Sequence, residues 1–441
     1  MKATIKVKLY PNHKKARHLR QSLGNVRFIW NKLLEMEIKL YEKEKRFIWY
    51  FEMCKEITKL RGKHPFLKET SGLVLQQMAR KLHFALKNFV KHKDMLDFPK
   101  FKKKSRYDGI LIYPKDFKIT NKAIYLPKIG WVRFRDKIVK KTQWNEIVST
   151  AKQIWVKEEP DGFFAYIQYE KNPEPKPSNG KVVGIDVGIR NTVTLSNGEV
   201  YKIDKEKIMR LIEVSEYLQS IIDKKREINK KRKIKFSRRL EYLRRKRLKI
   251  LKKIRNIYED FYYKATNHIL NSHEYVVIED LDLSELMQVE HKNEKAERNI
   301  HKYLMYIAIG RFFSILEYKA QLYDRKVVKV EPKDTSKTCS NCGYVYHELE
   351  LSDKNFRCPK CGFRIDRDLN ASVNILKRGL ELIAPSRLGR SSIGVKWQGL
   401  CLAYTPNLHP FRGGEDVSSI SHPWYEFHLF PKPSSSHPEL L

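Results

Sequence analysis

Four of the six cysteines in the chain form two Cys-x-x-Cys pairs that lie close together. Cys339 and Cys342 make the first pair, and Cys358 and Cys361 make the second, with fifteen residues between them. This spacing is typical of a Zn²⁺ site with four thiolate ligands. A redox pair is the alternative, but it would not need a second pair with a matching glycine. Because four thiolates leave no open coordination position, the predicted zinc is structural.

Two predicted strands carry acidic residues in apolar surroundings. Asp186 lies in the run 181–188, and Glu279 and Asp280 lie near the end of the run 273–281. Burial of a lone carboxylate is unfavourable, so such an acid should be protonated, paired or bound to a cation. Successive strand side chains point to opposite faces, so only one of Glu279 and Asp280 can face a given site.

A further acidic pair, Asp366 and Asp368, precedes a predicted helix, where an ordinary N-cap is the simplest interpretation. Taken singly, each acidic segment is better explained by a cap or a salt bridge. Three such segments in a basic protein, however, fit a two-cation phosphodiester site. One Mg²⁺ activates water there, and a second, about 3.5–4 Å away, stabilises the leaving oxygen. Carboxylate oxygens suit these hard cations.

The chain is strongly basic, with 89 Lys and Arg residues against 51 Asp and Glu and a formal charge of +38. Such a surplus repels itself unless a polyanion neutralises it, so nucleic acid is the predicted partner. No apolar run approaches the roughly 20 residues that span a membrane, and the start carries no signal-peptide pattern. The sequence therefore predicts a cytoplasmic or nucleoid-associated protein without a membrane partner.

The 441 residues, 41% of them hydrophobic, are enough for two to four domains. Alternating residues predict a strand at 4–10, and helical spacing predicts helices over about 14–91. Short strands from 109 to 169 predict a small β-barrel that the first strand completes. The Pro-rich segment 172–180 is the predicted boundary. Beyond it, strands and helices alternate to residue 376, which predicts an α/β domain.

A basic stretch, about 205–270, interrupts this second half. Its apolar stripe of Leu240, Leu243, Leu251, Ile254 and Tyr258 predicts a helical hairpin, and a merely solvated Lys/Arg face is the alternative to a nucleic-acid surface. After Ala384 the composition shifts to Pro, Ser, Gly and His, which predicts a disordered tail. The two lone cysteines, Cys54 and Cys401, are interpreted as packing and tail residues.

The order of these motifs resembles TnpB, the insertion-sequence proteins labelled OrfB-type transposases and related to type V CRISPR effectors. The likeness covers about residues 3–377 and extends into the first half through the segments 76–89 and 98–102. Ser372 departs from the family, in which a second alanine follows Asn370-Ala371. The motifs that carry the resemblance are Gly184–Gly188, Val277–Leu281, Thr335–Cys339, the two cysteine pairs and Asp366–Ala371.

The resemblance implies a multidomain fold of the α/β plus α+β kind. The expected parts are a β-barrel wedge domain (1–12 and 96–172), a helical recognition domain (13–95), a RuvC-like nuclease domain with an RNase H fold (181–334 and 362–384, with the basic helical insertion 205–270), a zinc ribbon (335–361) and a disordered tail (385–441).

The resemblance also implies an RNA-guided DNA endonuclease, with Asp186, Glu279 and Asp368 as catalytic ligands of Mg²⁺ or Mn²⁺ and Asp366 as a neighbour. The partners would be a guide RNA from the element and double-stranded target DNA with a short adjacent motif, bound by a protein for which a monomer is favoured. The residues expected to contact nucleic acid are Gln76, Gln77, Arg80, Lys100 and Lys102.

Two other functions stay open at this point. A nuclease-inactive relative could use guide RNA to occupy and repress DNA, although all three carboxylates are present. A transposition enzyme or accessory protein is the second, but the chain lacks the His-x-His and Tyr arrangement that single-strand transposition requires.

Overall fold

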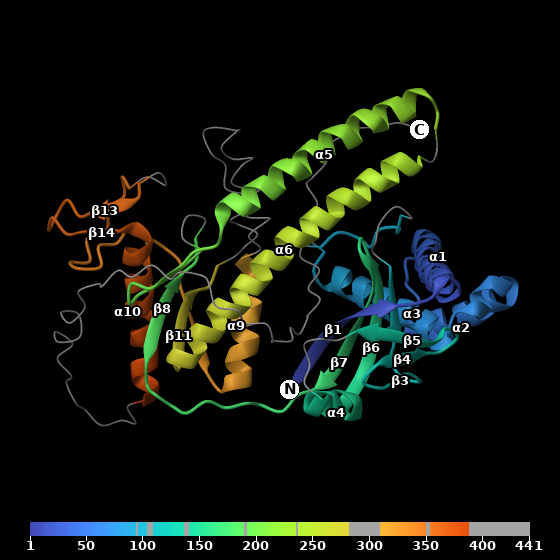
Figure 1. The fold of residues 1–441 in the computed structure, drawn as a ribbon, viewed down its shortest axis with the longest axis horizontal. Coiled ribbons are helices and arrows are strands. Elements are labelled where there is room, and N and C mark those ends of the chain that lie inside the picture. Colours follow the sequence, from blue (N-terminus) through green and yellow to red (C-terminus); the bar gives the residue numbers. More distant parts are fainter. Residues whose placement is uncertain are drawn as a thin grey trace. The chain divides into compact units, whose positions relative to one another are not determined.

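The computed structural model describes residues 1–93, 96–103, 109–135, 141–188, 192–234, 237–281, 309–349 and 353–387, so nearly all of the predicted tail lies outside the described residues. The chain divides after Lys171 into two compact units (Figure 1), and the division falls at the start of the Pro-rich segment 172–180.

The first unit contains one antiparallel sheet with the strand order β2-β6-β7-β1-β5-β4-β3. The first strand of the chain pairs with both β7 and β5, so it lies inside the sheet, and its alternation buries Ile5, Val7 and Leu9. The described pairings leave β2 and β3 at the two ends. The strands are β1 (Lys2–Tyr10), β2 (Ile110–Tyr113), β3 (Lys118–Ile119), β4 (Ala123–Leu126), β5 (Gly130–Arg135), β6 (Ala151–Glu159) and β7 (Gly162–Glu170).

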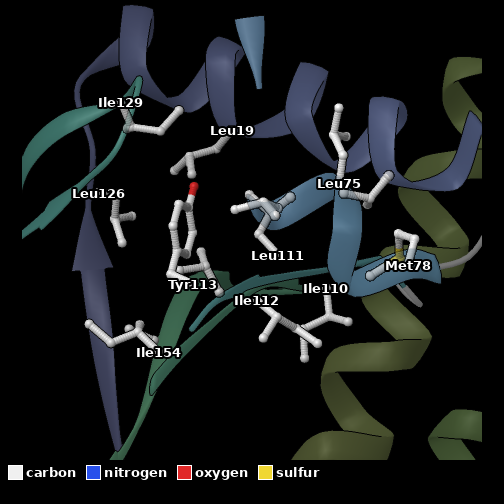
Figure 2. Close-up of a cluster of buried hydrophobic side chains, with 14 of the residues drawn as sticks. Leu19, Leu75, Met78, Ile110, Leu111, Ile112, Tyr113, Leu126, Ile129 and Ile154 are labelled. Atoms are coloured by element: carbon white, nitrogen blue, oxygen red, sulfur yellow. The ribbon is translucent and has the colours of Figure 1, made fainter. Parts of the chain in front are cut away.

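Helices of the first unit pack their apolar faces on this sheet. Figure 2 shows Leu19 and Leu75 of two helices beside Leu111 and Tyr113 of β2, and all four side chains are buried. Burial of such side chains contributes about 1.5–3 kcal/mol each, which makes this cluster the main stabilising core of the unit. The helices are α1 (His13–Glu44), α2 (Tyr50–Lys63), the 3-10 helix η1 (Pro65–Glu69), α3 (Gly72–Lys91) and α4 (Lys141–Thr150).

The second unit is built on a mixed sheet with the order β10-β9-β8-β11-β12. Strands β8, β11 and β12 run parallel, whereas β9 and β10 continue from β8 as antiparallel strands. Strand β11 is buried because it lies between two neighbours, which explains its unbroken apolar run. The strands are β8 (Val182–Asp186), β9 (Val193–Leu195), β10 (Val200–Tyr201), β11 (Tyr275–Glu279) and β12 (Lys326–Val330).

Two long helices, α5 (Lys205–Lys231) and α6 (Arg238–Ser272), lie side by side as a hairpin (Figure 1). Four residues of the predicted stripe on α6 are buried and Leu251 is partly buried. Ile254 and Tyr258 join the core of the unit, and Leu240 and Leu243 pack on α5. Helix α9 (Ile309–Tyr323) packs beside α6. Among the described residues, no helix is both long and apolar enough to cross a membrane.

Helix α10 (Arg367–Arg387) packs directly on strands β8 and β11 (Figure 1). A Cβ atom on Gly184 of β8 would lie 2.3 Å from the Ser372 carbonyl oxygen, and one on Gly379 of α10 would lie 2.3 Å from a Val277 methyl group. Only glycine allows this close approach. A two-stranded sheet, β13 (Asn355–Arg357) and β14 (Arg364–Asp366), precedes α10.

We expect Gly184→Ala to lower the free energy of unfolding of the second unit by about 1–3 kcal/mol, because the new methyl group must push backbone atoms of α10 away from the sheet. The matched control is Gly62→Ala in helix α2, where an added Cβ meets nothing within 4 Å. Thermal unfolding of both variants measures the difference. Equal unfolding midpoints for the two would show that the approach of α10 is not tight.

Candidate active site and zinc ribbon

Asp186 and Glu279 are the last residues of two neighbouring parallel strands, β8 and β11. The register pairs Val277 with Gly184, and each acid lies two residues further along its own strand. Because parallel strands end at the same edge of a sheet, the two carboxylates project at the same level. They come from segments more than ninety residues apart in sequence.

Asp368 reaches the same edge from the first turn of α10, where it is buried with 5% of its surface exposed. The neighbouring acid Asp366 has a different task, because its Oδ1 accepts the backbone N–H groups of Asp368 at 3.0 Å and Leu369 at 3.3 Å. Asp366 is therefore the capping residue, and Asp368 lies in the first turn of the helix that Asp366 caps.

Glu279 and Asp368 both act electrostatically on Asp186. The pKa of Asp186 is raised well above its usual range, first by burial and then by the negative charges of Glu279 and Asp368, while Arg367 opposes the rise. Burial likewise raises the pKa of Glu279, and the Thr335 hydroxyl, which donates to Glu279 Oε1, opposes that rise. Three clustered carboxylates of this kind need a cation before all can ionise, and hard oxygen donors fit Mg²⁺ or Mn²⁺.

Asp280, the other acid at the end of β11, takes no part in this cluster. Its carboxylate lies 3.6 Å from Lys329 Nζ, which also contacts Glu317 at 3.1 Å, and its side chain is 68% exposed. Strand geometry turns Asp280 away from Glu279, so the structure distinguishes two acids that the sequence left as alternatives.

The four cysteines form a second site, and their Sγ atoms all lie within 4.8 Å of one another. In the part of the chain that the structure describes, they are the only group of three or more candidate ligands gathered this closely, so the three carboxylates are less tightly clustered. Two matching turns carry the cysteines. Gly343 and Gly362 adopt φ values of +76° and +73°, and their N–H groups donate to the carbonyl oxygens of Cys339 and Cys358.

The chemistry of the thiols fits a structural Zn²⁺. The backbone N–H of Phe363 lowers the pKa of Cys361 to about 6, so this residue is a ready thiolate ligand. Burial raises the pKa of Cys339 to about 12, and a divalent cation would compensate for the charge of that buried thiolate. A small apolar cluster with Leu349 and Phe356 accompanies the cysteines.

The residues expected to contact nucleic acid fall on two elements of the first unit. Gln76 and Gln77 are partly buried on α3, and Arg80 is exposed one turn later. Lys100 pairs with Asp97 at 2.7 Å, and Lys102 Nζ lies 4.0 Å above the Trp30 ring. Lys100 and Lys102 therefore have partners within the protein, although Lys100, like Arg80, is exposed.

Several polar residues around the carboxylates received no role from the sequence. Thr335 contacts Glu279, Arg367 lies beside Asp368 at 3.9 Å, and Asn370 and Asn374 bind the segment that leads into the ribbon. In the sequence, only the i, i+4 spacing of Asn370 and Asn374 after Asp368 indicated such a role, because this spacing places both residues on one face of a helix.

Three family models match separate parts of the chain. They are described as "Cas12f1-like, TNB domain" (residues 310–375), "Probable transposase" of the OrfB IS605 type (165–290) and "Helix-turn-helix domain" of the same type (1–46). The first covers all four cysteines. The last covers strand β1 and the single helix α1, so the described structure of that region is one strand and one helix.

Relatives of similar length match nearly the whole chain. A protein of Streptomyces pristinaespiralis, named as a candidate RNA-guided DNA endonuclease, is 30% identical over 89% of this chain and 96% of its own length. InsQ of Escherichia coli K12, with the same description, is 27% identical over the same shares. Among solved structures, a Cas12f1–sgRNA–target DNA complex is similar in fold, with a TM-score of 0.52 and 16% identity over 82% of each chain.

We expect the purified protein to hold about one zinc per chain and Cys361→Ser to lose it, because a structural zinc contributes directly to folding free energy. Metal analysis and thermal unfolding measure both effects. The control is Cys54→Ser, which replaces a half-buried lone cysteine of the first unit and should keep full zinc content. A zinc-free protein of undiminished stability would contradict the assignment.

Proposed function

The chain belongs to the TnpB (OrfB, IS605) family, which is related to Cas12f. On this basis we propose that it is an RNA-guided DNA endonuclease that hydrolyses phosphodiester bonds, with Asp186, Glu279 and Asp368 as its catalytic carboxylates. The observation that carries this proposal is the meeting of the three acids at one edge of the sheet, where burial first and then the charges of Glu279 and Asp368 raise the pKa of Asp186. The similarity of the relatives over nearly the whole chain supports the same reading.

In this proposal, the three carboxylates hold Mg²⁺ or Mn²⁺, which when bound supplies an activated water and stabilises the leaving oxygen. The chain's own residues set the geometry. Two ligands come from adjacent strand ends and one from a helix that is packed directly on them, so their relative positions are fixed by backbone contacts. Arg367, which lowers the pKa of Asp186, offsets part of the negative charge.

The nuclease part is RuvC-like in this proposal and comprises residues 181–334 and 362–384, with the ribbon at 335–361. The mixed sheet supports it, since the proposed ligands lie where β8 and β11 end. The antiparallel sheet of the first unit (1–12 and 96–172) serves as the wedge domain, and the helices of residues 13–95 serve as the recognition domain.

The basic hairpin α5–α6 is the proposed surface for the backbone of an RNA–DNA heteroduplex. From Lys224 to Arg255 the sequence has eighteen Lys and Arg residues against two Glu, so much of the net charge is concentrated there. Tyr242 is 55% exposed and lies beside the Arg239 guanidinium, 5.5 Å from the ring centre to Cζ. Such a surface binds phosphates without reading sequence, which leaves target choice to base pairing.

We expect Asp186→Asn, Glu279→Gln and Asp368→Asn each to reduce DNA cleavage by more than about 10²-fold, because each removes a metal ligand. Binding to RNA should persist, since the basic surfaces are unchanged. The matched control is Asp280→Asn, an acid at the end of the same strand whose partner is Lys329. Full cleavage by Asp368→Asn would reject the proposed ligand set.

The same Asp186→Asn protein, loaded with zinc and kept in buffer without Mg²⁺ or Mn²⁺, supplies a second readout. A folded-state pKa above the unfolded value means that ionisation of Asp186 destabilises the metal-free fold as pH rises above about 4. We therefore expect the variant to unfold at a higher temperature than the wild type at pH 7.5, and Mg²⁺ to stabilise only the wild type. Equal midpoints without Mg²⁺ or Mn²⁺ would contradict the clustering of charge.

We expect target choice to follow the RNA and not the protein. The protein is purified with the RNA of its own element, only the guide segment is exchanged, and cleavage is measured on two DNA targets that share one flanking motif. Cleavage should move to the target that pairs with the new guide. Cleavage that ignores the guide, or that persists after complete removal of RNA, would show a self-sufficient nuclease instead.

A further inference from the structure

Helix α10 forms hydrogen bonds with the segment that leads from β12 to Cys339 and Cys342, the first cysteine pair, which we call the zinc knuckle. Asn370 Nδ2 donates to the carbonyl oxygen of Thr338 at 2.7 Å, and Asn374 Nδ2 donates to the carbonyl oxygens of Thr335 at 2.8 Å and Thr338 at 2.6 Å. Asn370 Oδ1 accepts the N–H of Ser340 at 2.9 Å. One helix face therefore fixes the backbone on both sides of Cys339.

The other end of the same segment lies on the catalytic cluster. The Thr335 hydroxyl donates to Glu279 Oε1, and Thr335 itself is only 4% exposed. Its carbonyl oxygen is the one that Asn374 holds. These hydrogen bonds thus connect Glu279, through Thr335, Asn374 and Asn370, to Thr338 and Ser340, the two neighbours of the zinc ligand Cys339.

Burial makes this set of contacts specific. Asn370 has no exposed surface and Asn374 has 6%, so each amide would be costly to bury without its partners. A buried amide that loses its acceptor costs about 1–3 kcal/mol, which favours the single arrangement in which all are satisfied. The segment from Thr335 to Ser340 is therefore held in one position relative to α10.

We propose that Thr335 is a positioning residue for Glu279, and that the zinc knuckle, through Asn370 and Asn374, holds Thr335 in place. This inference rests on the proposed function, because it takes Glu279 as a ligand of the catalytic cation. The Thr335 hydroxyl donates a hydrogen bond to Glu279 Oε1. This bond orients the carboxylate so that Oε2 would be left for the cation. The structural zinc and the catalytic cation are then coupled, although zinc itself touches no carboxylate.

The test measures Mn²⁺ binding to the zinc-loaded, full-length protein by electron paramagnetic resonance, independently of cleavage. Thr335→Val keeps the shape and removes the hydroxyl, and we expect it to raise the Mn²⁺ dissociation constant about 10-fold or more, as the loss of a partner of a metal ligand does. Thr335→Ser restores the donor and should bind Mn²⁺ like the wild type. The KM for Mn²⁺ in cleavage should rise more than kcat falls.

The matched control is Thr266→Val, which replaces another fully buried threonine of the second unit, on α6. Its hydroxyl has no hydrogen-bond partner among the described residues, so Mn²⁺ affinity should not change. Asn374→Ala tests the coupling: we expect weaker Mn²⁺ binding with zinc still present, because the loop that carries Thr335 is released.

Two failures are distinguishable. If Mn²⁺ binding requires Asp186 but Thr335→Val binds as tightly as the wild type, Thr335 has no positioning role and the proposed function stands. If Mn²⁺ binding by the wild type does not depend on Asp186, both the inference and the proposed ligand set are wrong. A Thr335→Ser protein as weak as Thr335→Val would also overturn the inference, because it would show that the hydroxyl is not what matters.

Discussion

The direct packing of α10 on strands β8 and β11 is the contact on which the rest of the second unit depends. Gly184 and Gly379 let backbone meet backbone and side chain at distances that any Cβ would prevent. At these two glycines the contact has little freedom to adapt, because neither has a side chain that could move aside. The position of Asp368 beside Asp186, and the position of Asn370 and Asn374 against the ribbon, both follow from it.

This rigid frame holds together charges that repel one another. Burial and the negative neighbours both oppose ionisation of Asp186, and Arg367 compensates only in part. The arrangement is unfavourable for the protein alone, and the divalent cation that we propose for this site would offset that cost, as is common where function and stability compete. The compact apolar core behind the sheet, with Val183, Ile185, Val276 and Ile278, supplies the stability that such a cluster removes.

The zinc ribbon, unlike the sheet, has little apolar core of its own. Its apolar cluster contains few residues besides two of the cysteines, too few to stabilise a fold of this size without a metal or another element. Zinc ligation and the hydrogen bonds from α10 replace the missing core. The same bonds bring Thr335 to Glu279, so the stabilisation of the ribbon and the geometry of the candidate active site rest on one set of contacts.

The sequence by itself determined the features whose causes lie within a few residues. The spacing of Cys339, Cys342, Cys358 and Cys361 identified the metal site, and alternation and helical spacing placed the first strand and the helices that follow it. Side-chain alternation also required Glu279 and Asp280 to face opposite ways, without saying which faced the site. The resemblance to TnpB favoured Glu279, and only the tertiary structure showed the pairing of Asp280 with Lys329, the capping task of Asp366 and the contact of Thr335 with Glu279. These outcomes depend on segments far apart in the chain that meet when their apolar faces are buried together, and no local pattern encodes that meeting.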